Sequence, residues 1–428
     1  MPTFTSHDGT ELAYRVTGEG SLLVCLPGGP VGAARAPGEP GGLAAHRRLV
    51  LLAPRGAGDA TAPGGPDTDR CGLEVADVES LRAHLGLDRI DLLGDCASED
   101  LALLYAARHP DRVASLTLVA SGVRAPGGDL SGVATAALAK LTAPVLVLTG
   151  AHEGGSAPKS AADLAALFPA AELAVQPGAG HHPWTDDAEA FARTVAAFLD
   201  PDVHAVVVDG VRLAYRVRGS EAAPPVILVH GRGGDSRDWD PIAERLAATR
   251  RVYALDLRGH GLSDWPGGYS FEAFRDDLHG FITELGLAGA DLVGHSMGGA
   301  AAALLAQEAP GLLGRLVLEE TPPLFPLDPP RGAVERPEGP LGFDWPVIEA
   351  VNAQLNDPDP AWRGRFAAIA TPTLVVAGGP ASRIDQKKLA WMASRIPDAR
   401  LVTIDAGHLV HTDRPDQFLS ALREFGIG

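Results

Sequence analysis

The stretch "DLVGHSMGGAAAALLAQ", residues 291–307, decides the fold of this chain. An apolar run typical of a buried strand ends at Gly294, and an Ala/Leu-rich run typical of a helix follows it. Ser296 stands at the bend, within the pattern Gly-x-Ser-x-Gly. Such a tight strand-to-helix turn needs flanking glycines, and it lifts the serine hydroxyl out of the sheet. The stretch therefore predicts that Ser296 is a nucleophile.

The first half of the chain contains a second version of this turn. It reads "LLGDCASEDLALLYAAR" over residues 92–108, with Cys96 at the bend. Further segments pair in the same order: 7–20 with 208–220, 22–30 with 226–234, 47–60 with 250–263, and 167–191 with 395–418. Because the whole set repeats once, we predict a tandem duplication, with domains over residues 1–201 and 202–428.

Each half alternates short strand-like runs with helical patterns. This alternation predicts an α/β fold, with a mostly parallel sheet flanked by helices in each domain. An Asp-Gly pair near the start of each half, Asp8-Gly9 and Asp209-Gly210, indicates an antiparallel hairpin at one edge.

The halves differ in the segment before the seventh strand-like run. It spans residues 321–371 in the second half but only 121–143 in the first. Ligands of parallel sheets bind beyond the carboxyl ends of the strands, where this insertion lies. We therefore predict a cap over a substrate cavity in the second domain, and a nearly absent cap in the first.

Composition excludes several classes of protein. The 428 residues carry a net charge of −18, which disfavours nucleic acids and anionic membrane surfaces as partners. The cysteines, Cys25, Cys71 and Cys96, form neither a disulfide framework nor a zinc-site spacing. With no recognisable leader or membrane span, we expect a cytoplasmic protein that acts on a small molecule without cofactor or metal.

A serine nucleophile needs a base and donors for the developing oxyanion. His408, in "AGHLVH" after the last strand-like run, is the candidate base, and His411 is the alternative. The predicted oxyanion donors are the backbone N–H groups of Met297 and of Arg232, the latter in the loop "HGRGG". The Arg232 side chain can face either the pocket or solvent, and we expect solvent.

The second half resembles the α/β-hydrolase superfamily over nearly its whole length. The matching motifs are "HGRGG" (230–234), "LDLRGHGLSD" (255–264), "GHSMGG" (294–299) and "AGHLVH" (406–411). The resemblance implies acyl-transfer chemistry shared by esterases, thioesterases, lactonases, C–C hydrolases, peptidases and cofactor-free haloperoxidases. A serine at the bend argues against the epoxide hydrolases and dehalogenases, which use aspartate.

The second half departs from the superfamily at the acid of the catalytic triad. The usual aspartate follows the seventh strand, where Ala381 stands here. An acid must reach the far nitrogen of His408 to fix its tautomer. We rank Glu320, at the end of the sixth strand-like run, first, Asp385 second and Glu319 third.

The first half resembles the prolyl-aminopeptidase-like branch of the same superfamily, on "PGGP" at residues 27–30. The resemblance implies a possible second site made of Cys96, Glu153 and His181.

Three features oppose activity there. Acidic neighbours of Cys96 disfavour the thiolate, and the cap is nearly absent. In addition, Ser98 replaces the second glycine of the strand-to-helix turn, which we call the elbow. The acidic neighbours are Asp95, Glu99 and Asp100. We therefore expect this domain to be a catalytically inactive copy.

These observations favour a serine hydrolase acting on a carboxylic ester, thioester or lactone through an acyl-enzyme. Two alternatives stay open at this point. One is a non-hydrolytic biosynthetic enzyme, of cyclase or lyase type, that reuses the same pocket. The other is a binding or scaffold protein made of two degenerate hydrolase folds.

Overall fold

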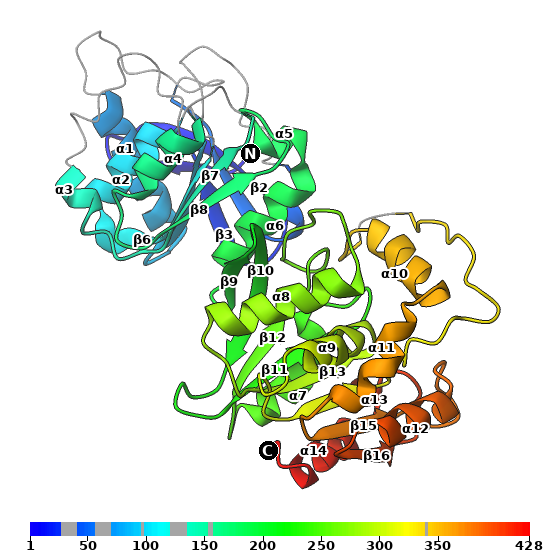
Figure 1. Ribbon diagram of the computed structural model, residues 1–428. Coiled ribbons are helices and arrows are strands. Elements are labelled where there is room, and N and C mark those ends of the chain that lie inside the picture. The colour runs from blue at the N-terminus through cyan, green and yellow to red at the C-terminus, as the bar shows by residue number, and fades with distance from the viewer. Residues whose placement is uncertain (27–40, 56–69, 96–97, 120–134, 153–156, 339–340) are drawn as a thin grey trace. The chain divides into compact units, whose positions relative to one another are not determined.

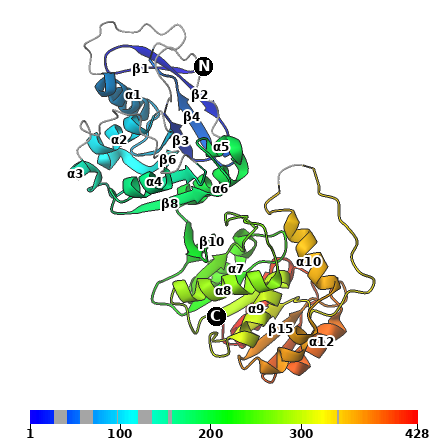
Figure 2. The same cartoon turned by 45° about the horizontal axis from the view of Figure 1, so that its top comes forward.

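The computed structural model describes most of the chain in two units, Met1–Asp200 and Pro201–Gly428 (Figures 1 and 2). The division falls one residue before the boundary predicted from the sequence. The described ranges are residues 1–26, 41–55, 70–95, 98–119, 135–152, 157–338 and 341–428.

The second unit contains a mostly parallel sheet, as predicted. In sheet order its described strands are β9 (Val203–Val208), β10 (Val211–Arg218), β12 (Arg251–Leu255), β11 (Pro225–Val229), β13 (Asp291–His295), β14 (Leu316–Glu319), β15 (Thr373–Ala377) and β16 (Ala399–Thr403). Strand β10 pairs antiparallel with both β9 and β12, and the remaining pairs are parallel.

Helices cover both faces of this sheet. The described helices are α7 (Asp240–Leu246), α8 (Phe271–Glu284), α9 (Ser296–Glu308), α10 (Pro346–Asn356), α11 (Pro360–Gly364), α12 (Gln386–Arg395), α13 (Val410–Asp413) and α14 (Pro415–Glu424), with short 3-10 turns at Ser236–Trp239 and Arg365–Ala368. Apolar side chains of α8 and α9 form one core with the sheet, and those of α7 and α14 form another. The sheet is therefore buried on both faces, which explains its nearly continuous apolar strands.

The hairpin predicted at Asp209-Gly210 is present at the edge of the second sheet. Asp209 and Gly210 both have positive φ, 47° and 81°, and they join β9 to β10 in the register Val208↔Val211. Positive φ at both central residues belongs to the type I′ turn, whose twist matches that of paired strands.

The first unit repeats this architecture. Its described strands, in sheet order, are β1 (Thr3–Thr5), β2 (Glu11–Thr17), β4 (Arg48–Leu52), β3 (Leu22–Cys25), β5 (Ile90–Asp95), β6 (Val113–Val119), β7 (Val145–Gly150) and β8 (Ala171–Gln176). Its described helices are α1 (Arg70–His84), α2 (Glu99–Arg108), α3 (Thr135–Leu138), α4 (Ala157–Ala165), α5 (Pro183–Asp186) and α6 (Ala188–Leu199), with 3-10 turns at Leu43–Ala45 and Pro110–Arg112. The strand order matches that of the second unit, so the predicted duplication is confirmed.

The two segments compared in the cap prediction are residues 321–371 of the second unit and residues 121–143 of the first. In the second unit the chain between β14 and β15 forms α10 and α11 and an extended segment beside α10 (Figures 1 and 2). The corresponding segment of the first unit, 121–143, lies largely outside the described residues. The contrast in cap size therefore stays a prediction.

The elbow glycines of the second unit are required by close approach. A methyl group on Gly294 would lie 2.7 Å from the Cα of Gly299, and one on Gly298 would lie 2.5 Å from the carbonyl oxygen of His230. Ser296 between them has φ 51°, a conformation costly for a residue with a Cβ. The sequence around Ser296 thus dictates an unusually tight turn.

We predict that Gly298→Ala will destabilise the protein by about 1–3 kcal/mol or more, because the added methyl group overpacks against the end of β11. Gly364→Ala is the matched control, since Gly364 has φ −62° and open space around its Cα. Urea unfolding of both variants checks this. Equal midpoints for the two variants would contradict the close approach.

Candidate functional site

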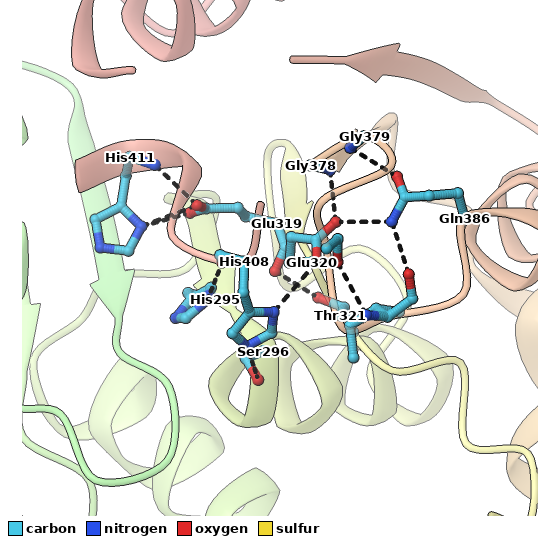
Figure 3. A network of polar contacts seen from close by, with 12 residues as sticks. His295, Ser296, Glu319, Glu320, Thr321, Gly378, Gly379, Gln386, His408 and His411 are labelled. Atoms are coloured by element: carbon cyan, nitrogen blue, oxygen red, sulfur yellow. Dashed lines mark hydrogen bonds and ion pairs between the residues drawn. The ribbon is translucent and has the colours of Figure 1, made fainter. Parts of the chain in front are cut away.

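Three predicted residues meet at the carboxyl edge of the second sheet. Ser296 begins α9 directly after β13, Glu320 follows β14, and His408 lies in the loop after β16. The His408 Nε2 atom is 3.2 Å from the Ser296 Oγ, and its Nδ1 is 3.2 Å from Oε2 of Glu320. Figure 3 shows the imidazole lying between the hydroxyl and the carboxylate.

Strand register explains how Ser296 and Glu320 come to the same level. His295 pairs with Glu319 across the parallel strands β13 and β14, so the next residue on each strand leaves the sheet at the same edge. Both of those residues have positive φ, 51° for Ser296 and 46° for Glu320. The backbone therefore turns sharply at Ser296 and again at Glu320.

The Glu320 carboxylate has no exposed surface, and it is held by donors from several segments. Besides His408, it accepts hydrogen bonds from the Gly378 N–H, the Ser382 hydroxyl and the Gln386 amide. Burial by itself would raise the pKa of Glu320, but these hydrogen bonds together lower it. The carboxylate is therefore ionised, as required of a partner for an imidazolium.

The loop that lacks the usual aspartate supplies two of these donors. Gly378 and Ser382 flank the Ala381 position, and a methyl group on Gly378 would lie only 1.7 Å from the carbonyl oxygen of Gly407. Asp385, the second candidate acid, is instead exposed, and its carboxylate accepts a hydrogen bond from the Lys387 N–H at the start of α12. The arrangement brings Glu320 to His408 and directs Asp385 elsewhere.

Glu319 and His411, the lower-ranked acid and the alternative base, form a second buried pair. The His411 Nδ1 lies 2.8 Å from Glu319 Oε2, and its backbone N–H donates to the same carboxylate. The His411 ring stacks on Trp239, with centroids 4.1 Å apart. Burial opposes protonation of His411, but the Glu319 charge outweighs it and raises the pKa of the imidazole.

His295 lies between the two Glu–His pairs (Figure 3). Its Nε2 atom donates to the carbonyl oxygen of His408 at 2.9 Å. Burial lowers the pKa of His295 to about 3, so the ring is neutral near pH 7. His295 therefore supports the backbone of the His408 loop and carries no charge.

The predicted oxyanion donors belong to segments that lie against the elbow. Met297 is the second residue of α9, and a methyl group on Gly231, next to Arg232, would lie 3.3 Å from the Ser296 Cβ. The expectation that the Arg232 side chain lies in solvent is wrong. It is half-buried, and its Nη1 donates to Oδ1 of Asn352 on α10 at 2.7 Å.

A cavity of about 170 Å³ opens onto the Ser296 and His408 side chains. Three apolar residues of its lining, Phe271, Met297 and Ile384, lie outside the segment predicted to be a cap. The other apolar lining residues belong to that segment and are Pro322, Pro323, Leu324, Phe325, Leu327, Val351 and Leu355. Its charged lining comprises Arg232, Arg331, Arg383, Lys388 and Asp385. Sequence reasoning missed Arg331, Arg383 and Lys388, because no local motif marks them.

The possible site in the first unit is only partly described. Cys96 and Glu153 lie outside the described residues, and His181 is an exposed residue after β8. At the end of β5, the Ser98 hydroxyl donates to the Asp95 carboxylate at 2.9 Å. An acidic group is thus held by a hydrogen bond at the position that precedes Cys96 in the sequence.

The described ranges lack a metal-binding cluster and a membrane-spanning helix. There, no three His, Cys, Asp or Glu side chains converge as ligands for a metal ion. In the same ranges, no helix combines the length and apolar character needed to cross a membrane.

Comparison with known proteins agrees with this geometry. The family model described as alpha/beta hydrolase fold matches residues 21–139 and 224–340. The chain belongs to the alpha/beta hydrolase fold family, and both halves carry the match.

Relatives align with about half of this chain. It is 27% identical over 259 residues to an sn-1-specific diacylglycerol lipase of Mus musculus, covering 50% of this chain and 84% of the relative. It is 29% identical over 263 residues to N-formylmaleamate deformylase of Pseudomonas putida, covering 51% and 94%. The solved structure of Est816, described as an N-acyl homoserine lactone degrading enzyme, matches with 27% identity and a TM-score of 0.45, covering 52% of this chain and 100% of the other.

We predict that Glu320→Gln will lower kcat by up to about 10⁴-fold on any ester that the protein cleaves, because an amide can leave His408 in the wrong tautomer. Asp385→Asn, which preserves the hydrogen bond at the start of α12, should leave kcat within about twofold. Steady-state kinetics of both variants, with thermal unfolding to verify folding, check this. The reverse order of effects would move the acid to the loop after β15.

We further predict that His411→Ala will destabilise the protein by about 3–5 kcal/mol, because it leaves the buried Glu319 carboxylate without its imidazolium. The raised pKa of His411 makes its contribution complete below the ordinary histidine value of about 6.5 and lost as pH rises through the folded-state pKa. The destabilisation measured by urea unfolding should therefore be larger at about pH 6 than at about pH 9.

His279→Ala, which removes an exposed imidazole of α8, is the control for this measurement. It should change stability by less than about 0.5 kcal/mol at either pH. A His411→Ala effect that does not depend on pH would mean that the pair is held by packing alone.

Proposed function

We propose that the second domain is a serine hydrolase that cleaves a carboxylic ester, thioester or lactone through an acyl-enzyme on Ser296. The observation that carries the proposal is the continuous set of contacts from the Ser296 hydroxyl through His408 to the buried Glu320 carboxylate. The relatives support the class of chemistry, because they include a lipase, a deformylase and an esterase or lipase.

In the acylation step, the Ser296 Oγ attacks the carbonyl carbon while His408 Nε2 takes the hydroxyl proton. Glu320, held ionised, stabilises the imidazolium that forms. The oxyanion of the tetrahedral intermediate accepts hydrogen bonds from the N–H groups of Met297 and Arg232. The C–O or C–S bond then breaks, and the leaving group takes the proton from His408.

Deacylation repeats these steps with water as the nucleophile. His408 removes a proton from the water as its oxygen attacks the acyl carbon, and then returns a proton to the Ser296 Oγ. The free acid leaves and the enzyme is restored. No redox partner or metal takes part in this sequence.

We propose that the first domain does not contribute chemistry. Two observations favour an inactive first domain: the carboxylate of Asp95, which precedes Cys96 in the sequence, and the exposed position of His181. The Glu320–His408 contact supplies an acid in place of the missing aspartate, which favours the hydrolase over the non-hydrolytic alternative. A cytoplasmic location fits the buried, unpaired thiol of Cys25.

We predict that Ser296→Ala will reduce kcat by about 10⁶-fold without unfolding the protein, because only oxyanion stabilisation and substrate binding remain. A fluorophosphonate probe should label the wild-type protein and Ser394→Ala, whose serine lies exposed on α12, but not Ser296→Ala. Mass spectrometry of the labelled peptide checks the site. Labelling that survives in Ser296→Ala would sink the proposal.

A further inference from the structure

The cavity beside Ser296 is basic in a chain that is strongly acidic. The protein has a net charge of −18, yet four cationic side chains and one carboxylate line this cavity. The cations are Arg232, Arg331, Arg383 and Lys388, and the carboxylate is Asp385. Since the cavity opens on the serine hydroxyl, its charge acts on whatever molecule reaches that hydroxyl.

Two of the guanidinium groups converge on a single neutral oxygen. The Oδ1 atom of Asn352 accepts a hydrogen bond from Arg232 Nη1 at 2.7 Å and another from Arg331 Nη1 at 3.1 Å. Asn352 is buried on α10, so it fixes both groups in place. Each guanidinium has five N–H donors, and most of these remain available to a ligand.

These arginines lack the carboxylate partners that other arginines of the unit have. Arg258 pairs with Asp277 at 2.5 Å, and Arg250 pairs with Asp291 at 2.9 Å. Within the described residues, none of Arg232, Arg331 and Arg383 has a carboxylate within 4.0 Å. Arg232 is half-buried and Arg331 and Arg383 are exposed, and no carboxylate of the described residues neutralises their charges.

The three groups also repel one another. Burial first, and then the charges of Arg331 and Arg383, lower the pKa of Arg232 to about 10. Burial and the Arg331 charge likewise lower the pKa of Arg383. Placing like charges together costs stability, and a bound oxyanion would relieve that cost through charge-assisted, bidentate hydrogen bonds.

We propose that the substrate carries an anionic oxygen group, a carboxylate or a phosphate, which Arg232, Arg331 and Arg383 bind while Ser296 attacks a nearby carbonyl carbon. This inference rests on the proposed hydrolase function and specifies its substrate class. The apolar residues Leu324, Phe325 and Leu355 line the same cavity and would contact the short carbon chain between the two groups. Lys388 adds a fourth positive charge at this wall.

The test compares two esters that differ only in the terminal group of the acyl chain: 4-nitrophenyl hydrogen glutarate, which ends in a carboxylate, and 4-nitrophenyl pentanoate, which ends in a methyl group. The wild-type kcat/KM should favour the glutarate by at least about tenfold at low salt, and the preference should shrink as ionic strength rises. Arg331→Gln and Arg383→Gln should each reduce the ratio of the two kcat/KM values about fivefold, mainly through KM for the glutarate. Arg336→Gln, an exposed arginine of the same segment outside the cavity lining, should leave the ratio unchanged.

A second measurement separates this inference from the proposed function. Glutarate should slow fluorophosphonate labelling of Ser296 at concentrations about tenfold below those of the neutral glutaramide, and Arg383→Gln should abolish the difference. Stronger protection by inorganic phosphate than by glutarate would assign the bound group to a phosphate. If Ser296 is labelled but glutarate and glutaramide protect it equally, the anion site is overturned and the proposed hydrolase function still stands. Absence of labelling overturns the hydrolase, and the anion site with it.

Discussion

The hydrogen bonds of the buried Glu320 carboxylate are the interaction on which the candidate site of the second unit depends. A charge without exposed surface is tolerated only where donors surround it. Here the donors come from the loops after β15 and β16 and from α12. Because the carboxylate only accepts, His408 must donate from Nδ1, which leaves Nε2 free to accept the serine proton. One buried charge thus sets both the loop positions and the tautomer of the base.

Two adjacent glutamates at the end of β14 have separate roles. Glu319, the last residue of β14, reaches His411 beside Trp239, whereas Glu320, which follows the strand with positive φ, reaches His408. The Glu319 pair anchors the loop that carries His408, through α13 immediately after it. The His408 imidazole is therefore held by Glu320 directly and by Glu319 through the following helix α13.

Much of the fold was predictable from the sequence, because its signals are local. The glycines around Ser296, the Asp209-Gly210 turn and the alternation of strands and helices each act over a few residues. The acid of the site was less determined, since the linear order allowed a ranking of Glu320, Asp385 and Glu319 but did not single one out. The hydrogen bonds of the folded chain distinguish them, because Glu320 contacts His408, Glu319 contacts His411 and Asp385 accepts from the Lys387 N–H.

The basic cavity could not be predicted in the same way. Arg232, Arg331 and Arg383 come from three separate loops, and no periodic pattern connects them. The Arg232 side chain was expected in solvent because arginine is usually exposed. What holds it at the cavity is Asn352, a residue of α10 that is 120 positions away in the sequence. Contacts of this kind appear only once the segment before β15 is placed over the sheet.

The two copies of the fold separate the residues that the fold needs from those that the chemistry needs. Gly94 and Gly294 are retained in both copies, because a methyl group at either would collide with the following helix. Gly298 makes room instead for the carbonyl of His230, at the start of the loop predicted to bind the oxyanion, and its counterpart is Ser98.

Asp256, whose carboxylate holds two loops of the second unit, is another residue that only one copy of the fold has. Asp256 accepts hydrogen bonds from the backbone N–H groups of Ser236 and Leu262, and its counterpart in the first unit is Ala53. The sheet and both cores of the first unit form without that carboxylate. The stability of the fold resides in the apolar strands and helices, whereas the residues proposed for catalysis lie in loops at the strand ends. One copy of the fold can therefore lose those residues and still fold.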